Sequence, residues 1–416
     1  MRLIRDLLVA ALVAAAVFCI LELALRLAGV KFEAQLFTSD GARGYAWRPR
    51  AEGWAVVEGE NYVRINSDGL RDRERSLAKP PRTLRIAVIG SSEVAAQQVP
   101  LEKTFESVLE KHLNDALRPA GYQAEVINFG VDGYNQAQDY LTIRDQVWKY
   151  QPDIVMFAAM PAMLTRNTRE LFPPMVSTTP FYDVENGEAV PDRLTRSFRA
   201  PSAAKLRLKD ALASVVNRSQ ILLAIDDLRN GLPENIRKLR LDFHPVMAAT
   251  KQPHSLSLLE QVHNPDNPKL RKSWEIADAL LEKMNETCKQ HGAEFWLTIL
   301  SDPYTDNPNP ESRRTEERRL GLPSLLLTDQ RLADMASRRG IEVALLSPQL
   351  ADYAAAHQVA LHGFFNTGFN TGHFNALGND VIGRMLAQVL LARSPVLRRR
   401  EMAGVNAGAG ETSSLK

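Results

Sequence analysis

The chain has 416 residues, of which 45% are hydrophobic and 24% are charged. These values are typical of a globular protein with a substantial core, and the length allows one large domain or two smaller ones. Because 51 basic residues stand against 49 acidic ones, the formal charge is only +2, which argues against a nucleic acid as the partner.

The N-terminus is the one strongly biased segment. Arg2 and Arg5 precede an apolar run over residues 7–20, and a mixed stretch extends this run to residue 30. As a helix, residues 7–20 rise only about 21 Å, whereas residues 7–30 reach about 36 Å against a hydrocarbon core of about 30 Å. A single membrane-spanning helix within residues 1–30 is therefore expected.

Two interpretations of this helix stay open. Glu22 and Arg26 stand four positions apart, so they share a helix face and offset each other's charge near the outer interface, which favours an uncleaved anchor. A cleaved signal peptide also fits the short apolar core, although no clear A-x-A site follows it. Arg2 and Arg5 place the N-terminus in the cytoplasm. The main domain is then expected outside the inner (cytoplasmic) membrane, in the periplasm or beyond, behind a single pass.

Residues 31–81 form a polar leader that contains Trp47, Trp54 and Tyr62. Aromatic side chains of this size need a surface on which to pack. The leader is therefore expected to lie against the main domain rather than to act as a flexible linker.

From residue 82 onwards, short β-rich runs alternate with helical patterns. The strand-like runs are residues 84–89, 124–129, 154–158, 294–300 and 342–346, and the helical patterns include residues 104–117, 136–150, 274–291, 325–339 and 376–391. This alternation predicts a parallel sheet covered by helices on both faces. The expected fold is α/β, a flavodoxin-like three-layer sandwich over residues 82–393.

The alternation breaks at residues 172–273, where a hairpin signal at Asn186-Gly187 is followed by two helical patterns. We expect an insertion over the carboxyl edge of the sheet, where ligands bind in open α/β folds. A lid or a partner surface is its expected role. Residues 394–416, rich in Gly, Ala and Ser towards the end, are predicted to be a disordered, solvated tail.

The first candidate for chemistry is Gly90-Ser91-Ser92, directly after a predicted strand. A strand that ends in Gly and Ser at the carboxyl edge of a sheet exposes a hydroxyl beside free backbone N–H groups, which suits a nucleophile with an oxyanion hole. A plain tight turn is the alternative. Gly130 ends another strand at the same edge, where its N–H would face Ser92 or merely serve a turn.

The third candidate is His373, in the glycine-rich segment 368–378 just before the final predicted helix. A histidine at this place is poorly positioned for a core and well positioned to reach a neighbouring serine. His362 is its main competitor.

Together these segments resemble the SGNH (GDSL-like) hydrolases, particularly the bacterial members with an N-terminal membrane helix. The resemblance covers the anchor and residues 65–72, 85–93, 99–105, 128–135 and 372–378, whereas the insertion has no evident match. It implies that Ser92 is the nucleophile, that Gly130 and the backbone of Ser92 hold the oxyanion, and that His373 is the base.

Three departures from the family pattern bear on catalysis. The usual Asp before the nucleophile is Ser91, and the usual Gly-x-Asn-Asp motif has no counterpart in residues 154–164, so a third oxyanion contact is missing. The usual Asp three residues before the histidine is Asn370, which can orient His373 but cannot stabilise its cation. Losing one oxyanion donor costs about 10²–10³ in rate, and the Asp-to-Asn change beside the histidine of a serine protease cost about 10⁴.

Two functions are consistent with these residues. The first is a serine esterase or O-acyltransferase that acts on acylated cell-surface or exported polysaccharide, beside a membrane acyl-transporting partner, with Ser92 as nucleophile and His373 as base. The second is a catalytically inactive relative that binds glycan or scaffolds an envelope or polysaccharide-export assembly. A carboxylate from elsewhere, Asp132 or Asp352, is a candidate replacement for the missing Asp.

No cofactor is expected, because the sequence has neither a metal-ligand cluster with recognisable spacing nor a phosphate-binding glycine loop. Cys19 lies in the apolar N-terminal run and Cys288 has no partner in the soluble part. An internal disulfide framework is therefore excluded.

Overall fold

The computed structural model describes residues 2–172, 176–197, 202–230 and 262–399. At its centre is a five-stranded sheet in the order β11-β10-β7-β5-β6, in which every neighbouring pair is parallel. Its strands are β5 (Thr83–Gly90), β6 (Gln123–Asn128), β7 (Ile154–Ala159), β10 (Glu294–Ile299) and β11 (Glu342–Leu345). All residues of β5 and β7 are buried, as expected for parallel strands covered on both faces.

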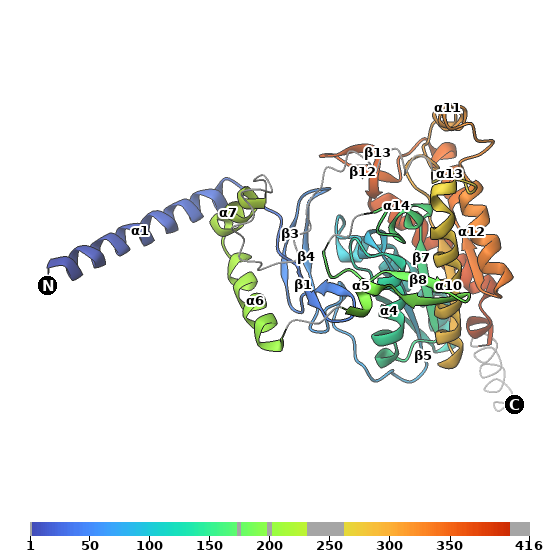
Figure 1. Cartoon of the computed structure of the whole chain (residues 1–416), viewed down its shortest axis with the longest axis horizontal. Helices are drawn as coiled ribbons and strands as arrows, with labels where there is room; N and C mark the ends of the chain where they lie inside the picture. Colours follow the sequence, from blue (N-terminus) through green and yellow to red (C-terminus); the bar gives the residue numbers. More distant parts are fainter. Residues whose placement is uncertain (1, 173–175, 198–201, 231–261, 400–416) are drawn as a thin grey trace, which may run out of the picture.

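Helices cover both faces of this sheet (Figure 1). Ile86 and Met156 belong to the apolar cluster on one face, and Ile89 and Phe157 belong to the cluster on the other, because alternate residues of a strand point to opposite sides. The first face carries α3 (Phe105–Leu117), α13 (Ser347–His357) and α14 (Ala376–Arg393), and the second carries α4 (Gln136–Asp145), α10 (Arg271–Gln290) and α12 (Leu327–Arg338). The predicted three-layer α/β fold is confirmed.

Shorter elements connect these layers. They are the helices α2 (Ser92–Ala95) and α11 (Pro310–Leu320), the antiparallel pair β12 (His362–Phe364) and β13 (Gly368–Phe374), and the 3-10 turns η1 (Leu101–Lys103), η2 (Arg118–Ala120), η3 (Val147–Tyr150), η4 (Pro161–Arg166) and η5 (Pro268–Leu270). Both α2 and β13 lie in segments that the sequence marks for chemistry.

The leader forms two hairpins that pack on the carboxyl edge of the sheet. They are β1 (Phe37–Asp40) with β2 (Gly44–Trp47), and β3 (Glu52–Ala55) with β4 (Asn61–Arg64). The indole of Trp47 is buried and donates to the carbonyl of Gly130 at 2.7 Å, and the hydroxyl of Tyr45 donates to the carbonyl of Asp132 at 2.9 Å. The leader is thereby hydrogen-bonded to the loop that follows β6.

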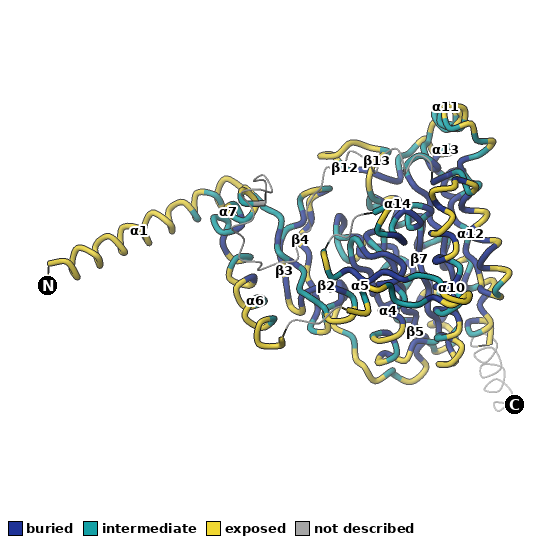
Figure 2. The backbone as a smooth tube through the Cα atoms, in the orientation of Figure 1, coloured by how far each residue is buried: buried dark blue, intermediate teal, exposed yellow. Residues whose placement is uncertain are grey.

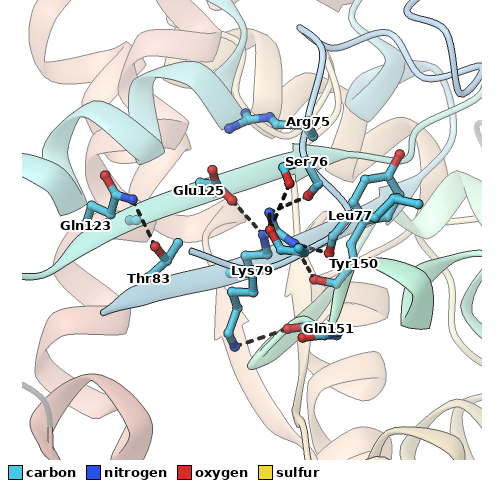
Figure 3. A network of polar contacts seen from close by, with 12 residues as sticks. Arg75, Ser76, Leu77, Lys79, Thr83, Gln123, Glu125, Tyr150 and Gln151 are labelled. Atoms are coloured by element: carbon cyan, nitrogen blue, oxygen red, sulfur yellow. Dashed lines mark hydrogen bonds and ion pairs between the residues drawn. The ribbon is translucent and has the colours of Figure 1, made fainter. Parts of the chain in front are cut away.

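The end of the leader is fixed where the strands of the sheet begin, by a buried cation whose partners Leu77, Glu125 and Tyr150 are labelled in Figure 3. The guanidinium of Arg85, on β5, is fully buried and pairs with Glu125 at 2.6 Å. It also donates to the carbonyls of Leu77 at 3.0 Å and Tyr150 at 2.8 Å. A buried charge is tolerated only when it is paired and its donors are satisfied, and here the leader supplies part of that pairing.

The described part of the insertion lies elsewhere than expected. The hairpin of β8 (Tyr182–Glu185) and β9 (Glu188–Pro191) turns at Asn186 and Gly187, both with positive φ, and contacts α10. The helices α5 (Arg193–Ser197), α6 (Ala203–Val216) and α7 (Gln220–Asn230) follow. Helix α6 contacts β1, and α7 contacts the N-terminal helix. These two helices therefore lie on the side of the leader hairpins that faces away from the central sheet, and not across the carboxyl edge of the sheet (Figure 1). The rest of the insertion, residues 231–261, lies outside the described residues.

The start of the predicted tail is also packed. Leu397 is fully buried, and the carboxylate of Glu294 accepts hydrogen bonds from the hydroxyl of Ser394 and the N–H of Val396, both at 2.7 Å. The apolar pattern after α14 continues for one more turn, which the composition of the tail concealed. Residues 400–416 lie outside the described part of the chain.

The N-terminal helix α1 (Arg2–Leu27) extends away from the domain (Figure 1) and has exposed side chains along nearly its whole length (Figure 2). Its 26 residues span about 39 Å, which exceeds a hydrocarbon core of about 30 Å. Within the described residues it is the one helix long and apolar enough to cross a membrane, a property that an N-terminal signal sequence shares.

Removing the buried cation should destabilise the whole domain. Arg85→Met leaves the carboxylate of Glu125 and the carbonyls of Leu77 and Tyr150 without this donor, so the free energy of unfolding should fall by about 3–5 kcal/mol. Arg64→Met is the matched control, because the Arg64 side chain is 78% exposed beside Glu52 and its loss should cost less than about 1 kcal/mol. Urea denaturation followed by tryptophan fluorescence measures both, and equal losses would contradict the anchoring role of Arg85.

Candidate active site

The predicted nucleophile begins a short helix at the carboxyl edge of the sheet. β5 ends at Gly90, and α2 starts at Ser92. A Cβ on Gly90 would lie 2.5 Å from the carbonyl oxygen of Ala158 and 2.6 Å from a methyl of Val94, so only glycine allows this close turn. The first N–H groups of a helix have no intrahelical acceptor, so the N–H of Ser92 is a candidate donor to an oxyanion.

The hydroxyl of Ser92 is engaged by its neighbour. It donates to Oε2 of Glu93 at 3.2 Å, and Oε1 of the same carboxylate lies 3.9 Å from Nε2 of His373. The side chain of Ser92 is almost fully buried. The carboxylate of Glu93 therefore stands between the predicted nucleophile and the predicted base.

His373 is held by a carboxylate that the sequence did not reveal. Glu58, in the turn between β3 and β4, binds the histidine twice: Nδ1 lies 2.5 Å from Oε2, and the backbone N–H of His373 donates to Oε1 at 2.8 Å. Gly372 makes this approach feasible, because a Cβ there would lie 2.0 Å from Oε1 of Glu58. The ring is thereby fixed through Nδ1, and Nε2 faces the carboxylate of Glu93.

The turn that carries Glu58 is itself clamped to the β12–β13 hairpin. The N–H of Gly59 donates to the amide oxygen of Asn366 at 2.8 Å, and the amide nitrogen of Asn366 donates to the carbonyls of Val56 and Gly59 at 3.1 Å each. Glu58 and His373 are 315 positions apart in the chain, and no local pattern around Glu58 predicts their contact. The aromatic residues of the leader predicted that it packs on the main domain, but they did not indicate which of its residues contacts His373.

Charge at the site favours the protonated histidine. Burial of His373 opposes its charged form, but the hydrogen bond to Glu58 and the negative charges of Glu93, Glu58 and Asp132 outweigh it and raise the pKa of His373 to about 9. Burial likewise acts to raise the pKa of Glu58, yet the contacts with His373 leave that pKa below its usual value. At pH 7 only about 1% of His373 is then neutral.

Asn370 does not orient the histidine. The pairing of β13 with β12 shifts register between Phe369 and Phe374, and within this bulge Asn370 lines a surface pocket with Pro303 and Tyr304. Its φ of 59° bends the strand further at this point. The Nδ1 atom of His373 is occupied by Glu58, which corrects the expectation that Asn370 takes this role.

His362 is separated from the site by its own partners. It is buried, its Nδ1 lies 3.1 Å from Oδ2 of Asp306, and its ring stacks on Phe374 at 3.8 Å between centroids. The hydroxyl of Ser301 donates to the same Asp306 carboxylate at 2.7 Å. This contact ties β12 to the loop after β10, so His362 supports the hairpin that carries His373.

Gly130 lies beside α2, but its N–H is engaged. A Cβ on Gly130 would lie 2.4 Å from the backbone nitrogen of Ala95, which explains the glycine. Its N–H donates to Oδ1 of Asn128 at 2.8 Å, and the amide of Asn128 in turn donates to the carbonyl of Val94 at 2.6 Å. Gly130 therefore lies beside the helix that begins at Ser92, as predicted. Its N–H can bind an oxyanion only if its hydrogen bond to Asn128 breaks.

A guanidinium lies just after residues 154–164, the segment in which SGNH hydrolases carry their Gly-x-Asn-Asp oxyanion motif. Arg166 ends η4, which follows β7, and its Nη1 donates to the hydroxyl of Ser91 at 2.9 Å. A small cavity of about 40 Å³ opens here between Ser91, Glu93, Asp139 and Arg166 over an apolar floor that includes Phe157. Residues 154–164 supply no donor, as expected, and the donor stands two positions further on.

Of the two carboxylates considered as replacements, one lies near the site. Burial raises the pKa of Asp132, and its charge is among those that raise the pKa of His373. Asp352 is exposed on α13. Within the described residues, no group of three or more His, Cys, Asp or Glu side chains could hold a metal ion.

The five-stranded parallel sheet thus brings Ser92, Gly130 and His373 to one edge, with the histidine just before the last long helix. This is the three-layer α/β arrangement that the sequence predicted. Neither a protein-family model nor a curated protein matches the chain.

Solved structures that this chain resembles include three lipolytic or esterase proteins. A lipase/acylhydrolase from Enterococcus faecalis is 11% identical, with 74% of this chain and 96% of that chain covered at a TM-score of 0.33. A G-D-S-L family lipolytic protein from Veillonella parvula is 10% identical (74% and 97%, TM-score 0.32). A catalytic mutant of an acetylxylan esterase from Geobacillus stearothermophilus is 9% identical (76% and 95%, TM-score 0.35). Likenesses of this size carry no argument about chemistry, which rests on the side chains described above.

The Glu58–His373 pair should stabilise the fold in a pH-dependent way. Because the pKa of His373 rises from 6.5 to about 9 on folding, the stabilisation is fully present below pH 6.5 while Glu58 is ionised, and is lost as the pH rises through 9. Glu58→Gln should lower the free energy of unfolding by about 1–3 kcal/mol at pH 7 and by much less at pH 10.

Urea denaturation of the full-length protein in detergent, at both pH values, measures this difference. Glu60→Gln is the control, because the Glu60 side chain is 41% exposed and pairs with Lys31 at the surface, so its loss should cost less than about 1 kcal/mol at either pH. A cost for Glu58→Gln that does not change between pH 7 and pH 10 would argue against the ion pair.

Proposed function

We propose that this chain is a serine esterase or O-acyltransferase of the cell envelope that acts on cell-surface or exported polysaccharide. The observation that carries the proposal is the ring of His373, fixed through Nδ1 by Glu58, with Nε2 3.9 Å from the carboxylate of Glu93 that accepts from the hydroxyl of Ser92. A carboxylate on Nδ1 holds an imidazole in the orientation in which Nε2 exchanges a proton with a nucleophile and stabilises the imidazolium that forms.

In the proposed reaction, Oγ of Ser92 attacks the acyl carbonyl while neutral His373 takes the hydroxyl proton on Nε2. We assign the developing oxyanion to the N–H of Ser92, at the start of α2, and to the guanidinium of Arg166, which donates to the adjacent Ser91. When the tetrahedral intermediate collapses, the C–O bond to the alcohol breaks and the alcohol leaves with the proton from His373. Water or a sugar hydroxyl then attacks the acyl group on Ser92, again with its proton passing to His373 and on to Ser92.

Two features limit this reaction at neutral pH. His373 must be neutral to accept a proton, and with a pKa of about 9 the reactive fraction rises about tenfold per pH unit up to that value. The carboxylate of Glu93 must also turn away from Ser92 before Nε2 of His373 can reach the hydroxyl. Substrate binding that displaces Glu93 would meet both requirements, because removing a nearby negative charge also lowers the pKa of the histidine.

The size and placement of the site support the proposed substrate class. The cavity beside Ser91 is only about 40 Å³, which suits a short acyl group such as acetyl better than a fatty acyl chain. An N-terminal helix that stays in the cytoplasmic membrane would hold the domain in the periplasm or outside the cell, where polysaccharides are exported and modified. A membrane acyl-transporting partner would supply the acyl group to a transferase.

A second candidate is a catalytically inactive protein that binds glycan or scaffolds a polysaccharide-export assembly. The groups that catalysis needs are engaged within the protein: the hydroxyl of Ser92 by Glu93, and the N–H of Gly130 by Asn128. Together with a cationic His373, this arrangement favours a binding site without turnover.

Labelling by a fluorophosphonate probe, followed by hydrolysis of an aryl acetate, separates the two candidates. In the full-length protein, labelling at Ser92 should rise about tenfold per pH unit from pH 7 towards pH 9 and then level off. Ser92→Ala should abolish it and His373→Ala should remove its pH dependence, while Ser312→Ala, on the distant helix α11, should leave it unchanged.

Labelling that survives Ser92→Ala would sink the catalytic assignment. A stably folded wild-type protein without labelling or turnover between pH 7 and pH 10 would establish the inactive alternative. In the same assay Glu93→Gln should move the rise to lower pH, because the charge of Glu93 contributes to the raised pKa of His373; complete loss of labelling would instead make Glu93 the proton acceptor.

A further inference from the structure

One face of the insertion helices is apolar and lacks cover within the described residues. On α6, Leu208, Leu212 and Val215 are 61%, 40% and 57% exposed, and their spacing of four and three positions places them on one side of the helix. Ala213, on the other side, is buried where α6 meets β1. An exposed apolar row of this length is unusual on a soluble surface and marks an interaction site.

The next helix continues this apolar surface. On α7, Ile225 and Leu228 are 55% and 72% exposed, whereas Leu223 is buried. Figure 2 shows that α6 is exposed over most of its length, and that α7, which is largely half-buried, lies beside the C-terminal end of the bare helix α1. Both helices thus expose apolar side chains, and α7 does so next to the candidate membrane span.

Hydrogen bonds fix this surface to the end of α1. The carboxylate of Glu22 accepts from the hydroxyl of Ser219 at 2.9 Å and from the N–H groups of Gln220 at 3.0 Å and Ile221 at 3.1 Å. It therefore caps the N-terminus of α7, as an acidic group does favourably. The guanidinium of Arg26 donates to the carbonyl of Arg218 at 2.6 Å. The C-terminal end of α1 and the start of α7 are consequently joined by hydrogen bonds and hold a fixed position relative to each other.

This joint determines where α6 lies when α1 spans a bilayer. A carboxylate that caps another helix has to sit at the polar interface and not in the hydrocarbon core, so Glu22 marks the level of the headgroups. Figure 1 shows α6 running across the direction of α1 at this same end. A helix in that position lies along the membrane plane, with its outward face at the boundary between headgroups and acyl chains.

The charges on α6 fit that placement. Lys205 precedes Leu208 by three positions on the same side of the helix, and Arg207 is also exposed. Long basic side chains beside an apolar row extend their charges to lipid phosphates while the stems stay in the apolar layer. Basic residues close to a membrane surface each contribute about 1 kcal/mol to binding anionic lipid.

We propose that α6 and α7 form an interfacial membrane-binding surface that lies on the same bilayer that α1 enters, with anionic phospholipid as its preferred headgroup. The surface consists of Lys205, Leu208, Leu212, Val215 and Leu228. It holds the leader hairpins, and with them the turn of Glu58, at a fixed distance from the membrane. The inference rests on α1 remaining in the membrane and is independent of the catalytic proposal.

Depth-dependent quenching in the full-length protein tests this placement. A fluorophore on Leu208→Cys, in a Cys19→Ser background, is compared in vesicles of phosphatidylethanolamine and phosphatidylglycerol that contain a lipid with a nitroxide near its headgroup. The label should be quenched at least about threefold more strongly than one on Thr315→Cys in α11, far from α1. A label on Leu12→Cys within α1 reports insertion of the anchor.

Two further variants separate apolar burial from a general effect of the anchor. Leu212→Asp with Val215→Asp should reduce quenching at position 208 to the level of position 315, with the circular dichroism spectrum unchanged. Replacing phosphatidylglycerol by phosphatidylcholine should weaken quenching at position 208, and an unchanged value would overturn the anionic preference.

Three outcomes overturn the proposal. They are quenching at position 12 without quenching at position 208, absence of quenching at both positions, and crosslinking of position 208 to a second copy or another protein in place of lipid quenching. Each is independent of whether Ser92 reacts with a fluorophosphonate, so a failed membrane surface and a failed enzyme are distinguishable.

Discussion

The carboxylate of Glu58 binds His373 through both the ring Nδ1 and the backbone N–H, and the rest of the site depends on this contact. It sets the orientation of the imidazole, and with Glu93 and Asp132 it raises the pKa of the ring to about 9. It also joins two hairpins that are distant in sequence, because the turn around Glu58 and the hairpin of β12 and β13 share the clamp of Asn366. The protonation state of the base is therefore a property of how the leader docks.

The leader can hold His373 protonated because it is fixed to the sheet at both the carboxyl ends and the amino ends of the strands. Trp47 and Tyr45 bond to carbonyls beyond β6, next to α2, while Arg85 holds the end of the leader at the opposite edge. These contacts involve buried polar groups, whose loss leaves unpaired donors and acceptors and so costs more than a surface contact. The site is accordingly assembled from three parts of the chain: the leader, the β5–α2 turn and the final hairpin.

The sequence predicted the features that depend on local pattern. The apolar parallel strands and the positions of Ser92 and His373 at their carboxyl edge follow from periodicity, glycines and the resemblance to SGNH hydrolases, and the three-layer fold agrees with this. Glu58 was missed because its role depends on a contact across 315 positions that no periodicity encodes. Asn370 was expected to orient His373 because it stands three residues before it, where the family has an Asp, but these residues lie in a bulge of β13 and Glu58 takes the ring Nδ1 instead. Arg166 escaped notice because it stands just past the expected motif, and Leu397 because its neighbours resemble a tail.

The same charges that hold His373 in place also restrain it, since an imidazolium between Glu58 and Glu93 is well ordered and a poor base. Activity then requires either alkaline pH or a ligand that displaces Glu93, whereas a purely structural role requires neither. Both possibilities depend on the raised pKa of His373, which an NMR titration of its ring C–H signal in the full-length protein measures directly, with His373→Gln identifying the signal. We expect a midpoint near 9, whereas a midpoint close to the ordinary histidine value of about 6.5 would show that Glu58 and Glu93 do not hold the ring protonated.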